Sequence, residues 1–222
     1  MLAECGVKVS ENVLELKNLA ISFDTPEGEV EAVRGIDLSV KAGEILCIVG
    51  ESGCGKTVTC QSVMHLLPRY SRVKHGQMIV CGQDITNSSE KEMRKIRGGT
   101  MSMIFQDPLA TLNPTIPVGK QITEAIFKHK KVSREEAKKR AIELLELVGI
   151  EDAEKRYDLQ PHFFSGGMRQ RCVIAAALAT DPKLLFADEA TTALDVTVEA
   201  KILDLLMEIR DKTGIAIVLI TH

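Results

Sequence analysis

Residues 50–57, Gly-Glu-Ser-Gly-Cys-Gly-Lys-Thr, place glycines, a lysine and a hydroxyl at a spacing that suits phosphate binding. Glycines let the backbone curl so that successive N–H groups point inward, and the start of a helix adds a partial positive charge. The lysine would reach the outer phosphates of a nucleotide, and the threonine hydroxyl would occupy one Mg²⁺ position. The octapeptide therefore predicts a nucleoside triphosphate site formed by Gly50, Glu51, Ser52, Gly53, Cys54, Gly55, Lys56 and Thr57.

The segments on either side give this octapeptide the setting that a phosphate loop needs. The apolar run 45–49 predicts a buried strand before it, and residues 57–67 predict a helix after it. The alternative interpretation is a glycine-rich turn that happens to end in Lys-Thr. The strand before and the helix after argue against that alternative.

A second apolar run, residues 184–187, ends in the carboxylate pair Asp188 and Glu189. Carboxylate oxygens suit Mg²⁺, and a carboxylate can accept a proton from water. Asp188 is therefore predicted to help hold Mg²⁺, and Glu189 to polarise the water that attacks a phosphate. The pair could instead only cap the next helix, but the phosphate loop upstream favours the catalytic interpretation.

Residues 163–171, Phe-Phe-Ser-Gly-Gly-Met-Arg-Gln-Arg, predict a second helix start that can attract an anion. A phosphate loop already cradles its own nucleotide, so this second site is expected to contact a nucleotide held by a partner. The residues assigned to that contact are Ser165, Gly166, Gly167 and Met168.

With this string the sequence resembles the ATP-binding cassette (ABC) ATPases, whose defining motif is close to Leu-Ser-Gly-Gly-Gln-x-Gln-Arg. The Phe-Ser-Gly-Gly-Met form is most similar to the ATPase subunits of bacterial oligopeptide and dipeptide importers. The resemblance covers nearly the whole chain, with the motifs in the family's order.

The resemblance implies roles for residues that the motifs above do not include. Gln106 is similar to the Q-loop glutamine, with a catalytic role and a place at Mg²⁺, and Asp195 is similar to the D-loop aspartate near the nucleotide. His222 resembles the catalytic histidine that contacts the γ-phosphate. Phe23 stands where an aromatic ring stacks on adenine in the family, although a core phenylalanine is the alternative there.

The sequence departs from the family pattern in two places. Position 190 is alanine where the family usually has proline after the catalytic glutamate, which could loosen how Glu189 is aimed. Family members also continue beyond the position of His222, so we expect that the sequence is truncated there.

Composition limits the remaining possibilities. The chain has 222 residues, 45% hydrophobic and 27% charged, and its net charge of −3 gives no indication of a nucleic-acid partner. The six cysteines include no C-x-x-C pair, which argues for reduced thiols rather than a zinc site or disulfide framework. No apolar run approaches the roughly 18 residues that span a bilayer.

The order of expected elements indicates an α/β fold. Strands are expected at 13–22, 29–33, 36–40, 45–49, 101–105, 184–187 and 215–220, with a turn at 25–28 and a hairpin over 76–85. Helices are expected at 57–67, 119–129, 134–148, 166–179 and 198–210, with a loop at 107–118. We predict one ABC-type P-loop NTPase domain over 1–222: a mostly parallel core sheet, an antiparallel β-subdomain and a helical subdomain at roughly 107–180.

The resemblance also implies which partners the protein has and where in the cell it works. We expect an ATPase that uses ATP and Mg²⁺ and powers an importer of oligopeptides or dipeptides from the cytoplasmic face of the inner membrane. Its expected partners are a second ABC ATPase subunit (homo- or heterodimer, head to tail), membrane permeases and, indirectly, an extracytoplasmic binding protein. A nickel importer of the same branch, a soluble non-transport ABC ATPase and a phosphate-loop kinase are the alternatives.

Overall fold

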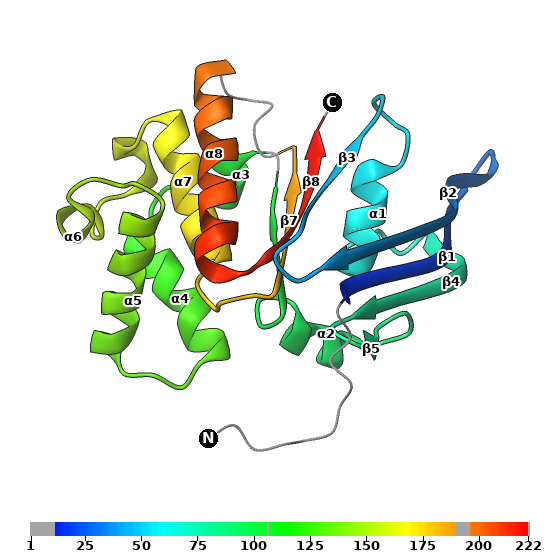
Figure 1. Ribbon diagram of the computed structural model, residues 1–222, viewed down its shortest axis with the longest axis horizontal. Coiled ribbons are helices and arrows are strands. Elements are labelled where there is room, and N and C mark those ends of the chain that lie inside the picture. Colours follow the sequence, from blue (N-terminus) through cyan, green and yellow to red (C-terminus); the bar gives the residue numbers. More distant parts are fainter. Residues whose placement is uncertain (1–11, 106, 190–195, 222) are drawn as a thin grey trace.

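The computed structural model describes residues 12–105, 107–189 and 196–221. Figure 1 shows an antiparallel sheet, a parallel sheet and a group of helices side by side. In the antiparallel sheet the order is β2 (Gly28–Lys41), β1 (Asn12–Thr25), β4 (Ser71–Val80) and β5 (Gln83–Asp84). In the parallel sheet it is β3 (Ile45–Val49), β8 (Ala216–Thr221), β7 (Leu184–Asp188) and β6 (Met101–Ile104). The predicted α/β class and its two kinds of sheet are confirmed.

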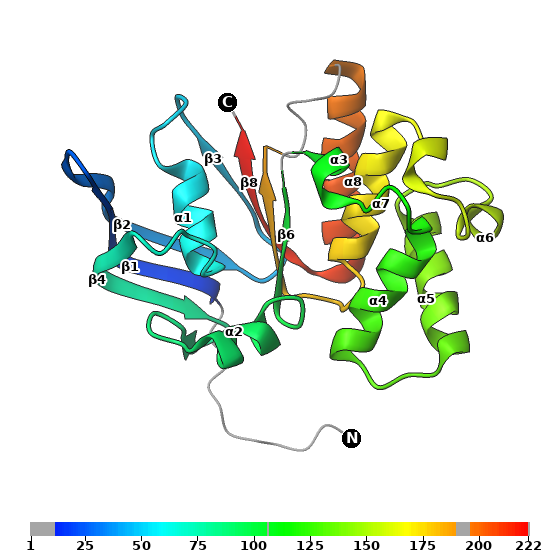
Figure 2. The same cartoon turned by 180° about the vertical axis from the view of Figure 1, so that it is seen from behind.

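The helices cover the parallel sheet from both faces. They are α1 (Lys56–Val63), α2 (Glu90–Ile96), α3 (Pro108–Thr111), α4 (Val118–His129), α5 (Arg134–Leu147), α6 (Ala153–Arg156), a 3-10 helix η1 (Pro161–Phe163), α7 (Gly166–Ala177) and α8 (Val196–Thr213). Helices α4 to α8 lie on one side of the parallel sheet, and α1 lies between the two sheets (Figures 1 and 2). Among the described helices, none is both long enough and apolar enough to span a bilayer.

Strand β7 shows how the core is divided. All five of its residues are buried, and successive side chains alternate between the two faces of the sheet. Leu185 and Ala187 pack with the helices α4 to α8, whereas Leu184 and Phe186 pack with α1 and the antiparallel sheet. The phosphate-loop helix is therefore fixed by apolar contacts with both sheets.

The strand before the phosphate loop differs from expectation. Among the described strands β3 pairs only with β8, so it lies at an edge of the parallel sheet. Cys47 is exposed and Val49 is 64% exposed. The prediction of a buried strand was wrong, because an apolar run does not reveal whether its strand will lie at the centre or the edge of a sheet.

Several predicted boundaries also change. Helix α1 ends at Val63, because His65 adopts the left-handed conformation at φ 50° that ends helices. The expected loop at 107–118 contains the short helix α3. Helix α2 was not predicted, although Ser89 and Glu92 form a capping box at its start.

Candidate functional site

The phosphate loop joins β3 to α1, and the glycine before the helix explains its close packing. Gly55 is the N-cap, with φ 94° and no side-chain hydrogen bond to the helix. A Cβ atom on Gly55 would lie 2.5 Å from the carbonyl oxygen of Ala32 on β2. Glycine therefore lets the loop pack on β2, and the first amides of α1 have no side chain capping them.

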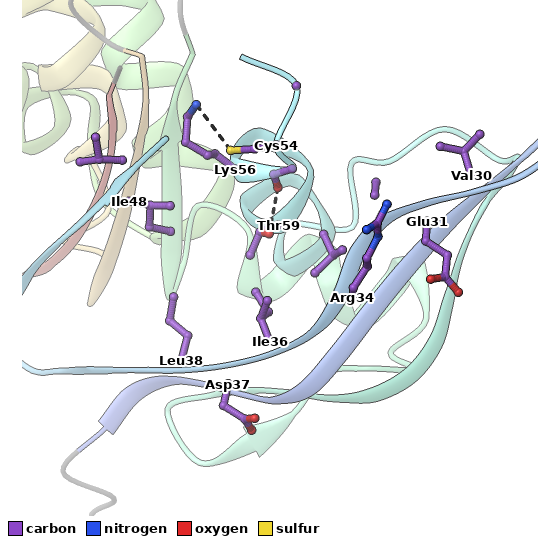
Figure 3. A pocket seen from close by; sticks show the side chains of 15 residues that line it. Val30, Glu31, Arg34, Ile36, Asp37, Leu38, Ile48, Cys54, Lys56 and Thr59 are labelled. Atoms are coloured by element: carbon purple, nitrogen blue, oxygen red, sulfur yellow. Dashed lines mark hydrogen bonds between the residues drawn. The ribbon is translucent and has the colours of Figure 1, made fainter. Parts of the chain in front are cut away.

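Lys56 places a cation inside this loop. The residue is 7% exposed, and its Nζ donates hydrogen bonds to the carbonyl oxygens of Gly50 at 2.6 Å and Glu51 at 2.9 Å. The Sγ atom of Cys54 lies 3.9 Å from the same Nζ, as the dashed line in Figure 3 marks. A buried ammonium ringed by loop atoms beside uncapped helix amides is a suitable binding site for phosphate oxygens.

Thr57 and Asp188, 131 positions apart in sequence, meet beside the loop. The Thr57 hydroxyl donates a hydrogen bond to Oδ1 of Asp188 at 2.8 Å. Burial raises the pKa of Asp188, and the charge of Glu189 raises it further, while the Thr57 hydrogen bond and Lys56 act in the opposite direction. A hydroxyl and a carboxylate are hard oxygen donors, so these two residues fit a Mg²⁺ ion.

Glu189 follows Asp188 at the end of β7 and is half-buried. Its backbone N–H donates to the carbonyl oxygen of Ile220 on β8 at 3.1 Å, and its φ of 47° is left-handed. That conformation costs a residue with a Cβ atom about 1–2 kcal/mol. Packing around the strand end therefore holds Glu189 in a strained backbone conformation next to the Thr57–Asp188 pair.

Two cavities flank the loop. The larger one, of about 820 Å³, lies between β2 and the loop, and its lining includes Val30, Val33, Gly53, Gly55 and Lys56 (Figure 3). No residue of β2 was predicted to belong to the site, because the sequence around Val30 and Val33 indicates only a strand.

The second cavity, of about 560 Å³, lies on the other side of Thr57. It brings the Thr57–Asp188 pair together with residues that follow β6. Two of these residues, Phe105 and Asp107, flank Gln106, the predicted Q-loop glutamine. Its lining is Thr57, Gln61, Phe105, Asp107, Ala110, Thr111 and Asp188.

Phe23 does not line either of these cavities. It is half-buried on β1 and packs against the core between the sheets, and its backbone neighbour on β2 is Val30. Its ring centroid lies 5.9 Å from that of Tyr70. The stacking of Phe23 on a base stays a prediction.

The Ser-Gly-Gly segment forms the start of α7. Ser165 is the N-cap, and its Oγ accepts a hydrogen bond from the backbone N–H of Met168 at 3.4 Å. Ser165 and Gly166 are exposed, whereas Gly167 packs so closely that a Cβ atom there would lie 2.9 Å from Cγ1 of Val198. Figures 1 and 2 place this helix start and the phosphate loop on opposite sides of β7 and β8.

Four residues singled out from the sequence lie outside the described residues: Gln106, Ala190, Asp195 and His222. The roles that the resemblance implies for them stay predictions. The described residues bring together Gly50 to Thr57 with Asp188 and Glu189, and they place Ser165 to Met168 elsewhere.

A parallel sheet with a lysine-bearing phosphate loop and a strand-end carboxylate defines a P-loop nucleotide-binding fold. Residues 33–192 match the ABC transporter family, and the chain belongs to that family.

The chain is 57% identical over 211 residues to the oligopeptide transport ATP-binding protein OppD of Bacillus subtilis (strain 168), covering 95% of this chain and 59% of that protein. It is 54% identical over 213 residues to the dipeptide transport ATP-binding protein DppD of the same strain, covering 96% and 64%. The chain thus spans about three fifths of the length of these relatives.

A solved structure shares the fold at 30% sequence identity with a TM-score of 0.81, covering 94% of this chain and 88% of the other. It is described as the dimeric, post-hydrolysis state of the ATP-binding cassette MJ0796 bound to ADP and Pi.

Proposed function

We propose that this chain binds and hydrolyses ATP as the nucleotide-binding domain of an importer for oligopeptides or dipeptides. The observation that carries the proposal is the meeting of Thr57 with Asp188 beside the buried Lys56. The names of the similar proteins, which are oligopeptide and dipeptide transport ATP-binding proteins, support the cargo class. We propose one domain over residues 1–222, with residues 107–180 as its helical part.

Binding of the triphosphate depends on the loop. The uncapped amides at the start of α1 would donate to phosphate oxygens, and the Lys56 ammonium would move from its two carbonyl partners to the phosphates. Thr57 and Asp188 would hold Mg²⁺, which neutralises the negative charge of the phosphates. The base would lie in the cavity along β2 that the loop borders.

Hydrolysis needs a proton acceptor next to the terminal phosphate, and Glu189 occupies the strand end that can supply one. Its carboxylate would take a proton from the attacking water as the water oxygen bonds to the γ-phosphorus. The bond from that phosphorus to the bridging oxygen then breaks, which yields ADP and phosphate. The left-handed backbone conformation of Glu189 sets the direction in which its Cα–Cβ bond leaves the strand end.

The Ser-Gly-Gly site would act on a nucleotide bound by another subunit. Its separation from the phosphate loop by the strands β7 and β8 supports a head-to-tail dimer in which each ATP lies between two subunits. Closing and opening of that dimer would drive membrane permeases served by an extracytoplasmic binding protein. We propose a peripheral position on the cytoplasmic face of the membrane.

Complementation between two inactive variants tests this proposal. Lys56→Ala breaks the phosphate loop, and Gly166→Asp places a negative charge at the exposed start of α7. An acidic residue is tolerated in the first turn of a helix, so Gly166→Asp should fold. Each variant alone should hydrolyse little ATP, whereas their mixture should regain activity, because a mixed dimer contains one intact composite site.

Hydrolysis rates of the two variants, their mixture and the unchanged chain should be measured at equal total subunit concentration. An unchanged chain that does not bind ATP contradicts the proposed function. An active chain whose two variants do not complement each other contradicts a site shared between copies of this subunit. Full activity of Gly166→Asp alone contradicts the role of the Ser-Gly-Gly segment.

A further inference from the structure

Gln170 on α7 is a buried side chain whose hydrogen-bonding groups are unused. The residue is 0% exposed, and neither its Nε2 nor its Oε1 atom has a hydrogen-bond partner within the described residues. Among these residues, Gln170 alone combines full burial with two unpaired polar atoms. Buried amides in native proteins are nearly always bonded, because an unpaired amide loses its water partners and gains nothing in return. The amide of Gln170 therefore destabilises the observed position of α7.

The two arginines beside Gln170 are bonded, so its unpaired amide is a local exception. Nε of Arg169 donates to the carbonyl oxygen of Pro161 at 2.9 Å, and Nη1 of Arg171 donates to the carbonyl oxygen of Val148. Successive residues of a helix are about 100° apart around its axis, so both arginines lie on other sides of α7 than Gln170. The arginines attach α7 to η1 and to the end of α5, and Gln170 makes no such attachment.

Gln170 lies on the face of α7 that packs against the interior. Residues three and four apart share a face of a helix, so Gln170 lies on the same stripe as Gly167, Val173 and Ile174. Val173 and Ile174 belong to the apolar core that α4 to α8 form on one side of the parallel sheet. A Cβ atom on Gly167 would lie 2.9 Å from Cγ1 of Val198 on α8. Helix α7 also contacts α3 and β6, and Figures 1 and 2 show α3 and α8 beside it.

The same helix begins with the Ser-Gly-Gly segment. Gln170 lies about one and a half turns after Ser165, the N-cap of α7. A helix moves as a unit, so a displacement of the exposed Ser165 and Gly166 toward a nucleotide on another subunit would also displace Gln170. A shift of α7 over its neighbours can bring the amide within reach of polar groups that it does not contact now. A ligand stabilises whichever position of α7 it binds more tightly.

We propose that Gln170 is a positioning residue for the site shared between subunits. Its amide forms hydrogen bonds when α7 moves to contact a nucleotide held by another subunit, and these bonds stabilise that position of α7. This proposal rests on the proposed function. The amide destabilises the free subunit and stabilises the engaged one, so both effects favour movement of α7 when the nucleotide is present.

The first test compares one substitution at two glutamines. Methionine is similar to glutamine in shape and flexibility but has no amide. Gln121 on α4 is the control, because its Oε1 accepts from the N–H of Asn113 at 2.9 Å and its Nε2 donates to the carbonyl oxygens of Asn113 at 2.9 Å and Ile116 at 2.7 Å. Without nucleotide, we expect Gln170→Met to unfold at a higher urea concentration than the unchanged chain, and Gln121→Met at a lower one.

The second test measures whether the more stable variant is impaired only between subunits. At concentrations where the chain is monomeric, Gln170→Met should bind Mg-ATP as the unchanged chain does, because Gln170 lies outside the phosphate loop. Its kcat should fall by roughly 10-fold with KM unchanged, which is the effect expected from the loss of about one hydrogen bond. Combined with Glu189→Gln, the substitution should weaken the dimer that forms with Mg-ATP by at least roughly 10-fold, measured by analytical ultracentrifugation.

These outcomes separate the two hypotheses. If the unchanged chain neither binds nor hydrolyses ATP, the proposed function fails. If the chain is active and Gln170→Met is less stable than it, the amide is already bonded in the free subunit and the proposal about Gln170 is wrong. A Gln170→Met chain that hydrolyses ATP and dimerises as the unchanged chain does, or that loses ATP affinity as a monomer, also overturns the proposal.

Discussion

Two helix starts in this chain expose backbone amides, and they differ in what surrounds them. At α1 the N-cap is Gly55, which provides no side-chain cap, and the buried Lys56 lies within the loop. At α7 the N-cap is Ser165, whose own hydroxyl accepts a hydrogen bond from a backbone N–H, and the segment is exposed. The residue after this N-cap is Gly166, so α7 has no cation at the position that Lys56 occupies in α1.

These surroundings decide which helix start can hold an anion within a single subunit. Helix α1 combines free amides, a desolvated cation and the Thr57–Asp188 pair, so it contains what a triphosphate needs. Helix α7 provides amides and a hydroxyl on an open surface, where an isolated helix start attracts an anion only weakly. Its contribution would appear when another molecule presents a phosphate already bound elsewhere.

The largest expected effect concerns the glutamate beside the α1 site. Glu189→Gln should leave ATP binding intact and slow hydrolysis by roughly 10²–10⁴-fold, because the proton acceptor is lost. It should also accumulate a nucleotide-bound dimer, detectable by size-exclusion chromatography with Mg-ATP. Glu154→Gln on the exposed face of α6 is the control. Hydrolysis at the unchanged rate would exclude Glu189 as the base.

Measuring ATP binding to the isolated subunit tests whether the two helix starts differ in this way. Lys56→Ala should weaken Mg-ATP binding by roughly 100-fold, because hydrogen bonds from a charged donor are lost. Gly166→Asp should bind ATP with unchanged affinity at protein concentrations where the chain is monomeric. Equal losses in both variants would mean that both helix starts contact one nucleotide within a single subunit. Lys91→Ala, on the surface of α2, controls for general charge effects.

Chemical labelling can sharpen the picture of the α1 loop. Cys54 is exposed in the loop, whereas Cys60 is buried within α1, where burial and the nearby Asp188 raise the pKa of its thiol. We expect a maleimide to label Cys54 at least roughly ten times faster than Cys60, since reaction needs an exposed thiolate. Mg-ATP should protect Cys54 but not the exposed Cys47, which serves as the control. Peptide mass spectrometry would measure how much of each cysteine is labelled. If Mg-ATP does not slow the labelling of Cys54, its thiol does not face the phosphates.

The smallest expected effect is a pH-dependent gain in stability. Because burial raises the folded-state pKa of Asp188, its protonated form stabilises the fold at low pH, and that stabilisation is lost as pH rises through the folded pKa. Asp188→Asn keeps an acceptor for Thr57 without the charge. We expect this variant to be more stable than the unchanged chain at pH 7, and the difference to disappear as the pH falls below the unfolded-state pKa of aspartate, about 3.9.

Asp181 provides a control of opposite sign. Burial acts to raise its pKa, but the hydrogen bond from Lys130 and the charge of Arg140 lower it overall. Asp181→Asn should therefore lose stability at pH 7 and approach the unchanged chain at low pH. Urea unfolding across this pH range measures both variants. If Asp188→Asn is less stable than the unchanged chain at neutral pH, the buried charge of Asp188 does not destabilise the fold.

Much of the α1 site could be predicted because its signals are local. The glycine, lysine and threonine spacing implies one backbone shape, and Asp188 was assigned because a carboxylate pair follows an apolar strand downstream of the phosphate loop. The hydrogen bond between Thr57 and Asp188 agrees with that placement. Neither signal needs knowledge of how distant segments pack.

The features that were missed depend on distant packing. Whether Ile45–Val49 is a central or an edge strand depends on which strands come to lie beside it, and nothing in its five residues contains that information. Val30 borders the proposed nucleotide site only because the β1–β2 hairpin brings it there. Helix α2 is different, because its capping box at Ser89 and Glu92 was a readable signal that was overlooked.

The pairing of β3 with β8 has a consequence for biosynthesis. The strand that carries the phosphate loop is made early, but among the described strands its only partner is the last one, at residues 216–221. At typical rates of translation, a growing chain needs roughly 10–30 s to extend from one strand to the other. During that interval the apolar strand Ile45–Val49 lacks the neighbour that orders it, so the nucleotide site is completed late while the β1–β2 hairpin can already form.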